Sequence, residues 1–245
     1  KKSNEQLNIL NYYLQILEDS KELLTNYLND DNLSIQNVNE IETEDKKLIR
    51  AKKIYLDFDT YGYTKDYLNE VVEQYNDFIN YHFNIDFNGR TTNDNIYDFY
   101  DTNYGDPNVR NIKESESHST HVSGIISGNR QNESGSKGIN NLVEIMALRA
   151  IPNGDEYDKD IARAIRYAVD NGAKIINGSF GKYFSSNPEW VIDAIRYASE
   201  NNVLVVAAAG NESKDLDSIS NDNYPNDQFF NKDEFSDTFI KVGAS

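Results

Sequence analysis

Hydrophobic residues recur at three- and four-residue steps through the first third of the chain, which is the spacing of helices that bury one face. The leucines predict a long helix from Asn4 to about Asn29 and a short helical turn through Val38–Ile41. A further helix is expected from Asp45 to about Phe58, and Thr64 is placed to cap another that runs through Ile79. The pattern therefore predicts an all-helical module over residues 1–83, whose leucine and tyrosine stripes form packing surfaces.

The pattern changes after residue 83. Residues 84–117 are rich in Asn, Asp, Gly and Tyr and show little periodicity, so we expect a long loop that links two parts of the chain. Beyond it, strands are expected at 143–149, 174–177, 203–209 and 239–243, and helices from His118, at 158–171 and at 188–201. Apolar strands that alternate with helices are typical of a parallel sheet with helices on both faces. The predicted fold class is α/β, as a partial domain over residues 118–245.

The composition narrows the classes of partner. The net charge is −17, and so acidic a surface would repel nucleic acid and anionic membranes. The chain has no cysteine, which excludes disulfides and thiolate metal sites. No apolar run approaches the ~18 residues that a membrane-spanning helix needs. The chain begins at Lys1 without an initiator Met or a signal segment, which indicates an internal piece of a longer or processed protein.

The loop over residues 84–117 carries carboxylates that could hold Ca²⁺. Their spacing fits no EF-hand pattern, and a solvated acidic surface is the competing interpretation. These residues are Asp86, Asp94, Asp98, Asp101 and Asp106. Structural Ca²⁺ therefore remains an alternative, while no cofactor is expected to be required and no metal ligand is assigned.

Two of the three histidines, His118 and His121, lie just before a run of small and apolar residues. Such small residues suit a helix that packs closely against its neighbours inside a core. An imidazole at the mouth of a buried helix could act as a general base. The competing interpretation is a histidine that only satisfies a hydrogen bond at a helix N-terminus.

Small polar turns follow two of the expected strands, at Asn177–Gly181 and at Ala209–Ser213. In parallel sheets, ligands bind beyond the carboxyl ends of the strands. The helix that starts at His118 is expected to begin on the same rim. The sequence therefore predicts a functional site where these three segments converge.

Together these segments resemble the subtilisin-like serine peptidases, the subtilase family. His118–Gly124 is similar to the family's His-Gly-Thr-His-Val-Ala-Gly segment, and Ile176–Gly181 resembles the Asn-Met-Ser-Leu-Gly strand end that lines the substrate cleft. Ala208–Asn211 matches the segment whose Asn donates to the oxyanion. Gly138-Ile139 and Tyr224-Pro225 also follow the family in order, and the resemblance extends over His118–Ser245.

The resemblance implies acyl transfer to a serine, with a protein or peptide as substrate. His118 would be the general base and Asn211 the oxyanion donor. The substrate-binding residues that it implies are Ser179, Phe180, Gly181, Ala209 and Gly210. It also implies a secreted or cell-surface endopeptidase, and Ca²⁺ is common in the family.

The sequence contains no Gly-Thr-Ser segment, where the family's nucleophile lies. The partial matches to the family's Asp-Ser/Thr-Gly segment, Asp59–Gly62 and Asp101–Asn103, do not follow a buried strand and are rejected. We expect the aspartate strand before Lys1 and the helical module as an insertion between Asp and His, as in some bacterial subtilases of the Bacteroidetes type. The fragment alone is then expected to be inactive.

Two residues depart from the family pattern. Ser119 replaces the Gly after the general base, and Gly178 replaces a bulky apolar residue, which predicts a gap or added flexibility beside the cleft strand. A catalytically inactive pseudoprotease or peptide-binding module on the same fold is therefore the alternative function. A further alternative makes the helical module a partner-binding or propeptide-like element.

Overall fold

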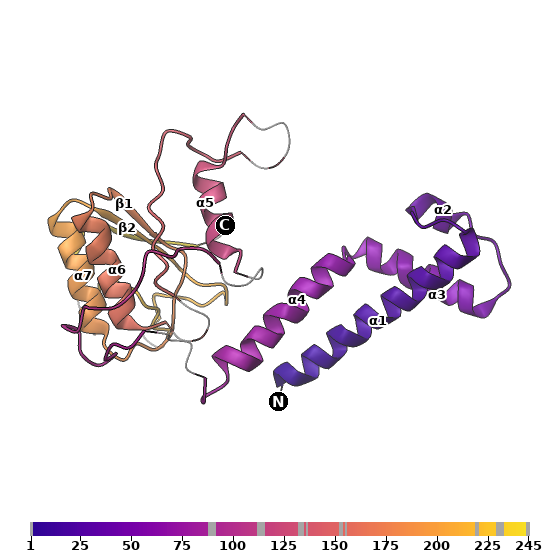
Figure 1. The fold of residues 1–245 in the computed structure, drawn as a ribbon, viewed down its shortest axis with the longest axis horizontal. Coiled ribbons are helices and arrows are strands. Elements are labelled where there is room, and N and C mark those ends of the chain that lie inside the picture. The colour runs from indigo at the N-terminus through magenta and orange to yellow at the C-terminus, as the bar shows by residue number, and fades with distance from the viewer. Residues whose placement is uncertain are drawn as a thin grey trace. The chain divides into compact units, whose positions relative to one another are not determined.

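A computed structural model describes residues 2–87, 92–111, 116–131, 135, 137–151, 154, 156–218, 221–228 and 233–243. The chain divides into two compact units, Lys1–Phe87 and Asn88–Ser245. Each unit has a hydrophobic core of its own. Figure 1 shows a first unit of helices and a second that combines helices with a sheet.

The first unit consists of α1 (Lys2–Leu28), α2 (Ile35–Asn39), α3 (Lys46–Thr60) and α4 (Lys65–Asp77), which a π-helical turn (Phe78–His82) extends. Both α3 and α4 pack along α1 (Figure 1). The predicted helices are thus confirmed, with ends shifted by a few residues.

Polar side chains start the helices of this unit. The hydroxyl of Thr64 accepts a hydrogen bond from the backbone N–H of Tyr67 at 3.1 Å, as predicted. Asp45 caps α3 in the same way through the N–H of Lys47, at 2.7 Å. Each cap satisfies a backbone donor that the first helical turn leaves without a partner.

The leucines and tyrosines of this unit have different environments. Leu17, Leu24 and Leu68 are buried, as the helical period predicts. The prediction that the tyrosines also form packing surfaces is wrong for several of them, because Tyr12 and Tyr61 are 55% and 71% exposed. A tyrosine tolerates this exposure because its hydroxyl remains hydrated while its ring contacts neighbouring rings.

The second unit contains a parallel sheet of β1 (Ile175–Gly178), β2 (Leu204–Ala208) and β3 (Phe239–Val242), in the order β1-β2-β3. This confirms the predicted parallel sheet at these three segments. The register places Ile176 opposite Val205, and Val205 opposite Phe239. These three side chains share one face of the sheet and belong to the core or pack against it.

Helices α6 (Asp158–Asp170) and α7 (Pro188–Glu200) pack on each other and on this face (Figure 1). On the opposite face, Ile175, Ile240 and Val242 are 63%, 47% and 53% exposed. Within the described residues, helices therefore cover one face of the sheet, and the prediction of helices on both faces is not met.

Helix α5 (His118–Ser127) does not supply the missing cover. It has no buried residue, so the prediction of a helix inside a core is wrong for the described chain. Its C-terminal turn instead accepts backbone hydrogen bonds from Gly138, Ile139 and Asn140. Gly138 is required there because a Cβ would lie 2.1 Å from the Gly128 amide nitrogen.

Residues 143–149, predicted as a strand, have no regular secondary structure, and their side chains are exposed. The apolar run predicts burial, but a strand also needs a neighbour that takes its backbone hydrogen bonds. This segment is held by Arg149 instead, whose guanidinium contacts the Glu116 carboxylate at 2.9 and 3.0 Å.

The loop prediction for residues 84–117 is confirmed where the structure describes them, because they contain no helix or strand before His118. Residues 92–111 nevertheless belong to the second compact unit and are anchored there by Lys159. The buried ammonium of Lys159 lies 2.6 Å from Asp94 and 2.8 Å from the Asn95 carbonyl. Asp94 therefore serves as the partner of a buried cation, whereas the sequence suggested a calcium ligand.

No helix in the described part of the chain is both long and apolar enough to span a membrane.

Candidate functional site

The carboxyl end of β1 continues into Ser179, Phe180 and Gly181, which the sequence predicted as substrate-binding residues. The Asn177 side-chain amide donates to the Ser179 hydroxyl at 2.8 Å and orders the first turn after the strand. Within the described residues, the backbone groups of 179–181 form no backbone hydrogen bond. These donors and acceptors are free to pair with an added chain.

The gap that the sequence predicted at Gly178 is filled. A Cβ at Gly178 would lie 3.1 Å from Cε1 of Phe180, so the glycine lets this ring fold back over the strand end. Phe180 packs against the hydrophobic core of the second unit. Its part in a substrate pocket remains a prediction.

The carboxyl end of β2 leads through Ala209 and Gly210 to Asn211. The backbone N–H of Ala209 still donates to the Val242 carbonyl at 3.0 Å, so the residue is held at the edge of the sheet. Gly210 then has a φ of 96°, a conformation that favours glycine. Asn211 is exposed, and its side-chain amide has no hydrogen-bond partner among the described residues.

A hydrogen bond joins the loops that follow the two strands. The Tyr183 hydroxyl donates to Glu212, which also accepts from the Asn211 backbone N–H at 3.0 Å. The Tyr183 hydrogen bond and then the Asn211 N–H lower the pKa of the Glu212 carboxyl below its usual value. The same bond raises the pKa of the Tyr183 phenol. The Lys214 ammonium lies 3.5 Å from the centre of the Tyr183 ring.

Below this edge, Lys182 and Tyr224 exchange two backbone hydrogen bonds as an antiparallel bridge, at 3.0 and 2.8 Å. The peptide between Tyr224 and Pro225 is cis. Gly181 borders the bridge closely, since a Cβ there would lie 3.2 Å from the Tyr224 carbonyl oxygen. The segment with Tyr224-Pro225, which the sequence placed in the family's order, thus lies beside the β1 strand end.

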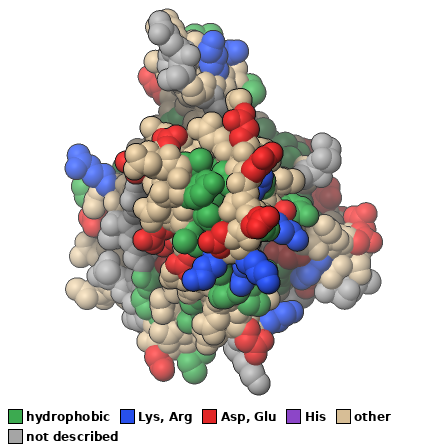
Figure 2. Space-filling view, turned by 90° about the vertical axis from the view of Figure 1, so that its right-hand side faces the viewer, with side chains coloured by type: hydrophobic (Ala, Val, Ile, Leu, Met, Phe, Trp, Pro, Cys, Tyr) green, Lys and Arg blue, Asp and Glu red, His purple; other side chains and the backbone are tan. Residues whose placement is uncertain are grey.

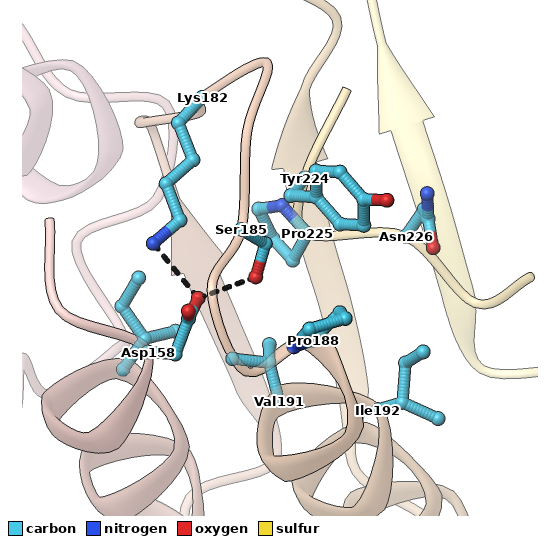
Figure 3. A pocket seen from close by; sticks show the side chains of 10 residues that line it. Asp158, Lys182, Ser185, Pro188, Val191, Ile192, Tyr224, Pro225 and Asn226 are labelled. Atoms are coloured by element: carbon cyan, nitrogen blue, oxygen red, sulfur yellow. Dashed lines mark hydrogen bonds and ion pairs between the residues drawn. The ribbon is translucent and has the colours of Figure 1, made fainter. Parts of the chain in front are cut away.

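The buried carboxylate of Asp158 fixes the loop that follows Gly181 (Figure 3). Asp158 accepts from the Ser185 hydroxyl at 2.7 Å and from the Asn187 backbone N–H at 2.9 Å, and pairs with Lys182 at 2.8 Å. The pocket beside it has a volume of about 10 Å³, which is about the space of one water molecule. The contacts of Asp158 stabilise the loop over residues 182–187, and the pocket is too small to take a peptide side chain.

His118 is the first residue of α5, and its side chain is exposed. Ser117, the residue before it, forms no side-chain cap, so the helix N-terminus stays open. In the described part of the chain, no hydrogen bond, ion pair or ring contact joins His118 to either strand end. The structure therefore connects two of the three predicted segments directly and leaves the third apart from these contacts.

Sequence reasoning missed the residues that fix the two strand ends. Tyr183 and Glu212 are 29 positions apart, and nothing in their local pattern marks a contact. Asp158 carries a partial signal, because an acidic residue in the first turn of a helix is favoured by the helix dipole. That signal predicts the start of α6 but not the contacts with Lys182 and Ser185.

The face in Figure 2 carries both acidic and basic side chains, with hydrophobic ones between them. Among the described residues, no group of three or more His, Cys, Asp or Glu side chains could hold a metal ion. Besides the His118 imidazole, the described part of the candidate site consists of backbone groups, the Asn211 amide, the Tyr183 phenol and the hydrogen-bonded carboxylates of Glu212 and Asp158.

The sequence model of the subtilase family matches residues 27–244. The thermophilic serine proteinase of Bacillus sp. (strain AK1) is 39% identical over 116 residues, which cover 47% of this chain and 27% of that protein. The C5a peptidase of Streptococcus pyogenes is 38% identical over 107 residues, which cover 40% of this chain and 9% of that protein.

The halolysin-like extracellular serine protease Nep of Natrialba magadii is 37% identical over 117 residues, which cover 47% of this chain and 20% of that protein. A solved structure of the prenylagaramide maturation protease PagA is 37% identical, with a TM-score of 0.34, and the match covers 39% of this chain and 35% of that one. The chain thus spans less than a third of the length of these curated relatives.

Proposed function

This chain belongs to the subtilase family, and on that premise we propose that it supplies the general base, the oxyanion donor and the peptide-binding strand of a secreted serine endopeptidase. The observation that carries the proposal is the edge of the sheet where β1 and β2 end side by side. There the free backbone of residues 179–181 and the exposed amide of Asn211 are joined through the Tyr183–Glu212 hydrogen bond.

The proposed chemistry is acyl transfer through a serine. The serine Oγ attacks the carbonyl carbon of the scissile peptide, and its proton passes to the His118 imidazole. The side-chain amide of Asn211 donates to the resulting oxyanion. Collapse of this intermediate breaks the C–N bond, and the leaving amine takes the proton back from His118. Water then releases the acyl group by the same steps.

The substrate is proposed to bind as an extended peptide next to residues 179–181. An added strand satisfies the free N–H and C=O groups of this segment, and side chains of alternate substrate residues then point toward the enzyme. Ala209 and Gly210 are proposed to border the same cleft from the β2 side. A protein or peptide substrate fits this mode, because recognition rests on main-chain hydrogen bonds.

The chain by itself is proposed to bind peptides without hydrolysing them, because its sequence offers no Gly-Thr-Ser segment and no accepted aspartate. A triad without its nucleophile retains only binding and oxyanion effects. The proposed secretion is supported by the extracellular relative from Natrialba magadii.

A serine-directed fluorophosphonate probe tests the enzymatic proposal on the full-length protein. We expect covalent labelling of the native protein, none after heat unfolding, and at least a hundredfold slower labelling in a His118→Ala variant. Full-length protein that is folded, binds peptide and is never labelled would exclude the peptidase.

One observation favours a second function, a peptide-binding module without catalysis. His118 makes no described contact with the strand ends, and Ser119 adds a side chain beside it. On this alternative the full-length protein binds an extended peptide at residues 179–181, and His118→Ala leaves the affinity unchanged. The probe experiment separates the two functions.

A further inference from the structure

Six aromatic side chains of the first unit form one connected group of ring contacts, which branches at Tyr63 and which we term the aromatic ladder. It consists of Tyr12 and Tyr13 in α1, Phe58 in α3, Tyr61 and Tyr63 in the turn after it, and Tyr67 in α4. Neighbouring ring centres lie 5.8 to 6.4 Å apart. The ladder lies where α3 ends and α4 begins, beside α1 (Figure 1).

The ladder is a surface feature. Tyr12, Tyr61 and Tyr67 are 55%, 71% and 47% exposed, and Tyr63 is 37% exposed. Tyr63 and Tyr67 are nearly parallel, with an interplanar angle of 10°. A group of exposed aromatic rings in contact with one another is typical of an interaction site, because each ring offers apolar area at little cost in conformational entropy.

The charged residues near the ladder indicate which sign of charge its partner carries. Four exposed carboxylates lie on α3 and α4 within four positions of ladder residues: Asp57, Asp59, Asp66 and Glu70. Lys65 is the basic residue in the same stretch, and Glu18 neutralises it at 2.5 Å. An aromatic surface surrounded by carboxylates is complementary to a cation.

The spacing of the rings selects an extended chain. Side chains of alternate residues in an extended peptide lie on the same side, about 6.6 Å apart. That distance is close to the 6.1 Å that separates the ring centre of Tyr63 from those of Tyr61 and Tyr67. A guanidinium group stacks on an aromatic face and pairs with a carboxylate through parallel N–H bonds, whereas an ammonium does neither as well.

We propose that the aromatic ladder of the helical unit binds an extended peptide segment with arginine at alternate positions. Successive guanidinium groups stack on the exposed rings of Tyr61, Tyr63 and Tyr67, and the carboxylates of α3 and α4 accept their N–H groups. This gives the helical unit a binding role that is independent of the proposed peptidase site.

The test uses the 245-residue chain and three fluorescent nonapeptides, in which serine alternates with arginine, lysine or glutamine. Fluorescence anisotropy should show the arginine peptide binding at least fivefold more tightly than the lysine peptide, with no measurable binding of the glutamine peptide. Changing Tyr61→Ala together with Tyr67→Ala should weaken arginine-peptide binding at least tenfold. Tyr61→Phe with Tyr67→Phe should keep it within twofold, because phenylalanine retains the ring face.

Tyr97→Ala is the matched control, since Tyr97 is a 79% exposed tyrosine of the second unit. Circular dichroism verifies the helices of each variant. If the alanine variant is unfolded, the double variant Asp59→Asn with Glu70→Gln serves as the test instead, and it should weaken binding of the arginine peptide at least threefold. Equal binding of arginine and lysine peptides, equal loss with Tyr97→Ala, or unchanged binding in the amide variant would overturn the proposal. Self-association in sedimentation, or binding of a neutral glucan, would also overturn the proposal if it depended on the ladder residues, because either result would identify a different binding partner.

Discussion

The phenol of Tyr183 donates a hydrogen bond to the carboxylate of Glu212 and ties the loop after β1 to the loop after β2. Gly210 permits this contact, because a Cβ there would lie 3.0 Å from Glu212 Oε2 and 3.2 Å from the Tyr183 hydroxyl. The same carboxylate accepts the backbone N–H of Asn211. Tyr183, from the neighbouring strand end, therefore holds the carboxylate that accepts the backbone N–H of the proposed oxyanion donor.

Replacing Tyr183 by phenylalanine is expected to raise the pKa of Glu212 toward the ordinary value of a glutamate. The Tyr183 hydrogen bond is the largest cause of the lowered pKa, and phenylalanine removes the donor while keeping the ring beside Lys214. A carbon-detected NMR titration of the Glu212 side chain measures the change, with Tyr97→Phe as the control. An unchanged Glu212 pKa would contradict the contact.

The same variant should change how stability depends on pH. A carboxyl whose pKa is lowered in the folded state stabilises the fold above its unfolded pKa, and this contribution is lost as the pH falls through the folded value. The original chain should therefore lose more stability than Tyr183→Phe between about pH 7 and about pH 3. Urea unfolding at both pH values measures this difference, and equal losses would contradict the lowered Glu212 pKa.

Lys241 gives a pH dependence of the opposite kind. Burial lowers its pKa to about 8, although its ammonium donates to the Asn223 carbonyl at 2.5 Å. The unfolded chain keeps this proton up to about pH 10.4, so stability from this group rises between about pH 8 and about pH 10.4. The free energy of unfolding relative to Lys241→Met should rise over that range in urea titrations. Lys214→Met is the control for the removal of an exposed lysine.

Lys159 is the residue of the described core at which a single substitution should be most costly. Its side chain is 1% exposed and pairs with Asp94, which is fully buried. Lys159→Met leaves a buried carboxylate without its cation, and such a change typically costs about 3–5 kcal/mol. Adding Asp94→Leu should recover part of the loss in urea unfolding. Lys65→Met removes an exposed ion pair, which solvent screens, and should cost far less than Lys159→Met.

The elements that the sequence predicted correctly are those with local causes. The leucine period and the Thr64 cap lie within single helices, and each of β1, β2 and β3 contains at least two consecutive apolar residues. Residues 143–149 show where this reasoning ends, since their apolar run is real but no neighbouring strand pairs with it. The exposed tyrosines likewise satisfy a helical period without being buried.

The candidate site divides in the same way. The assignments of His118 and Asn211 rest on residue order and on the chemical groups that the family motif requires, and they stay predictions. The contacts that fix the rim, such as Lys182 with Asp158, join residues far apart in the chain. No local pattern encodes such a pairing, so the arrangement of the rim had to come from the structure.

Two glycines near α5 should respond to alanine in opposite ways. Gly138→Ala places a Cβ 2.1 Å from the Gly128 amide nitrogen, so the segment must move away from the helix end. Gly124 lies inside the helix, and an added Cβ would meet no neighbouring side chain or segment within 4 Å, so alanine should stabilise by roughly 0.5–1 kcal/mol. Urea unfolding gives the signs, and hydrogen exchange at Ile139 and Asn140 should accelerate in Gly138→Ala alone. Equal behaviour of both variants would contradict the described packing.

The strongest catalytic prediction concerns Asn211 in the full-length protein. Asn211→Ala should lower kcat by about 10²–10³ with little change in KM, because the amide acts on the oxyanion and not on the bound substrate. This magnitude is the one known for the oxyanion asparagine of subtilisin, a member of the same family. Steady-state hydrolysis of a peptide substrate measures it. Asn171→Ala, at the C-terminal end of α6, is the matched control and should leave kcat unchanged. An increase in KM with unchanged kcat would instead make Asn211 a substrate-binding residue, and the oxyanion assignment would be wrong.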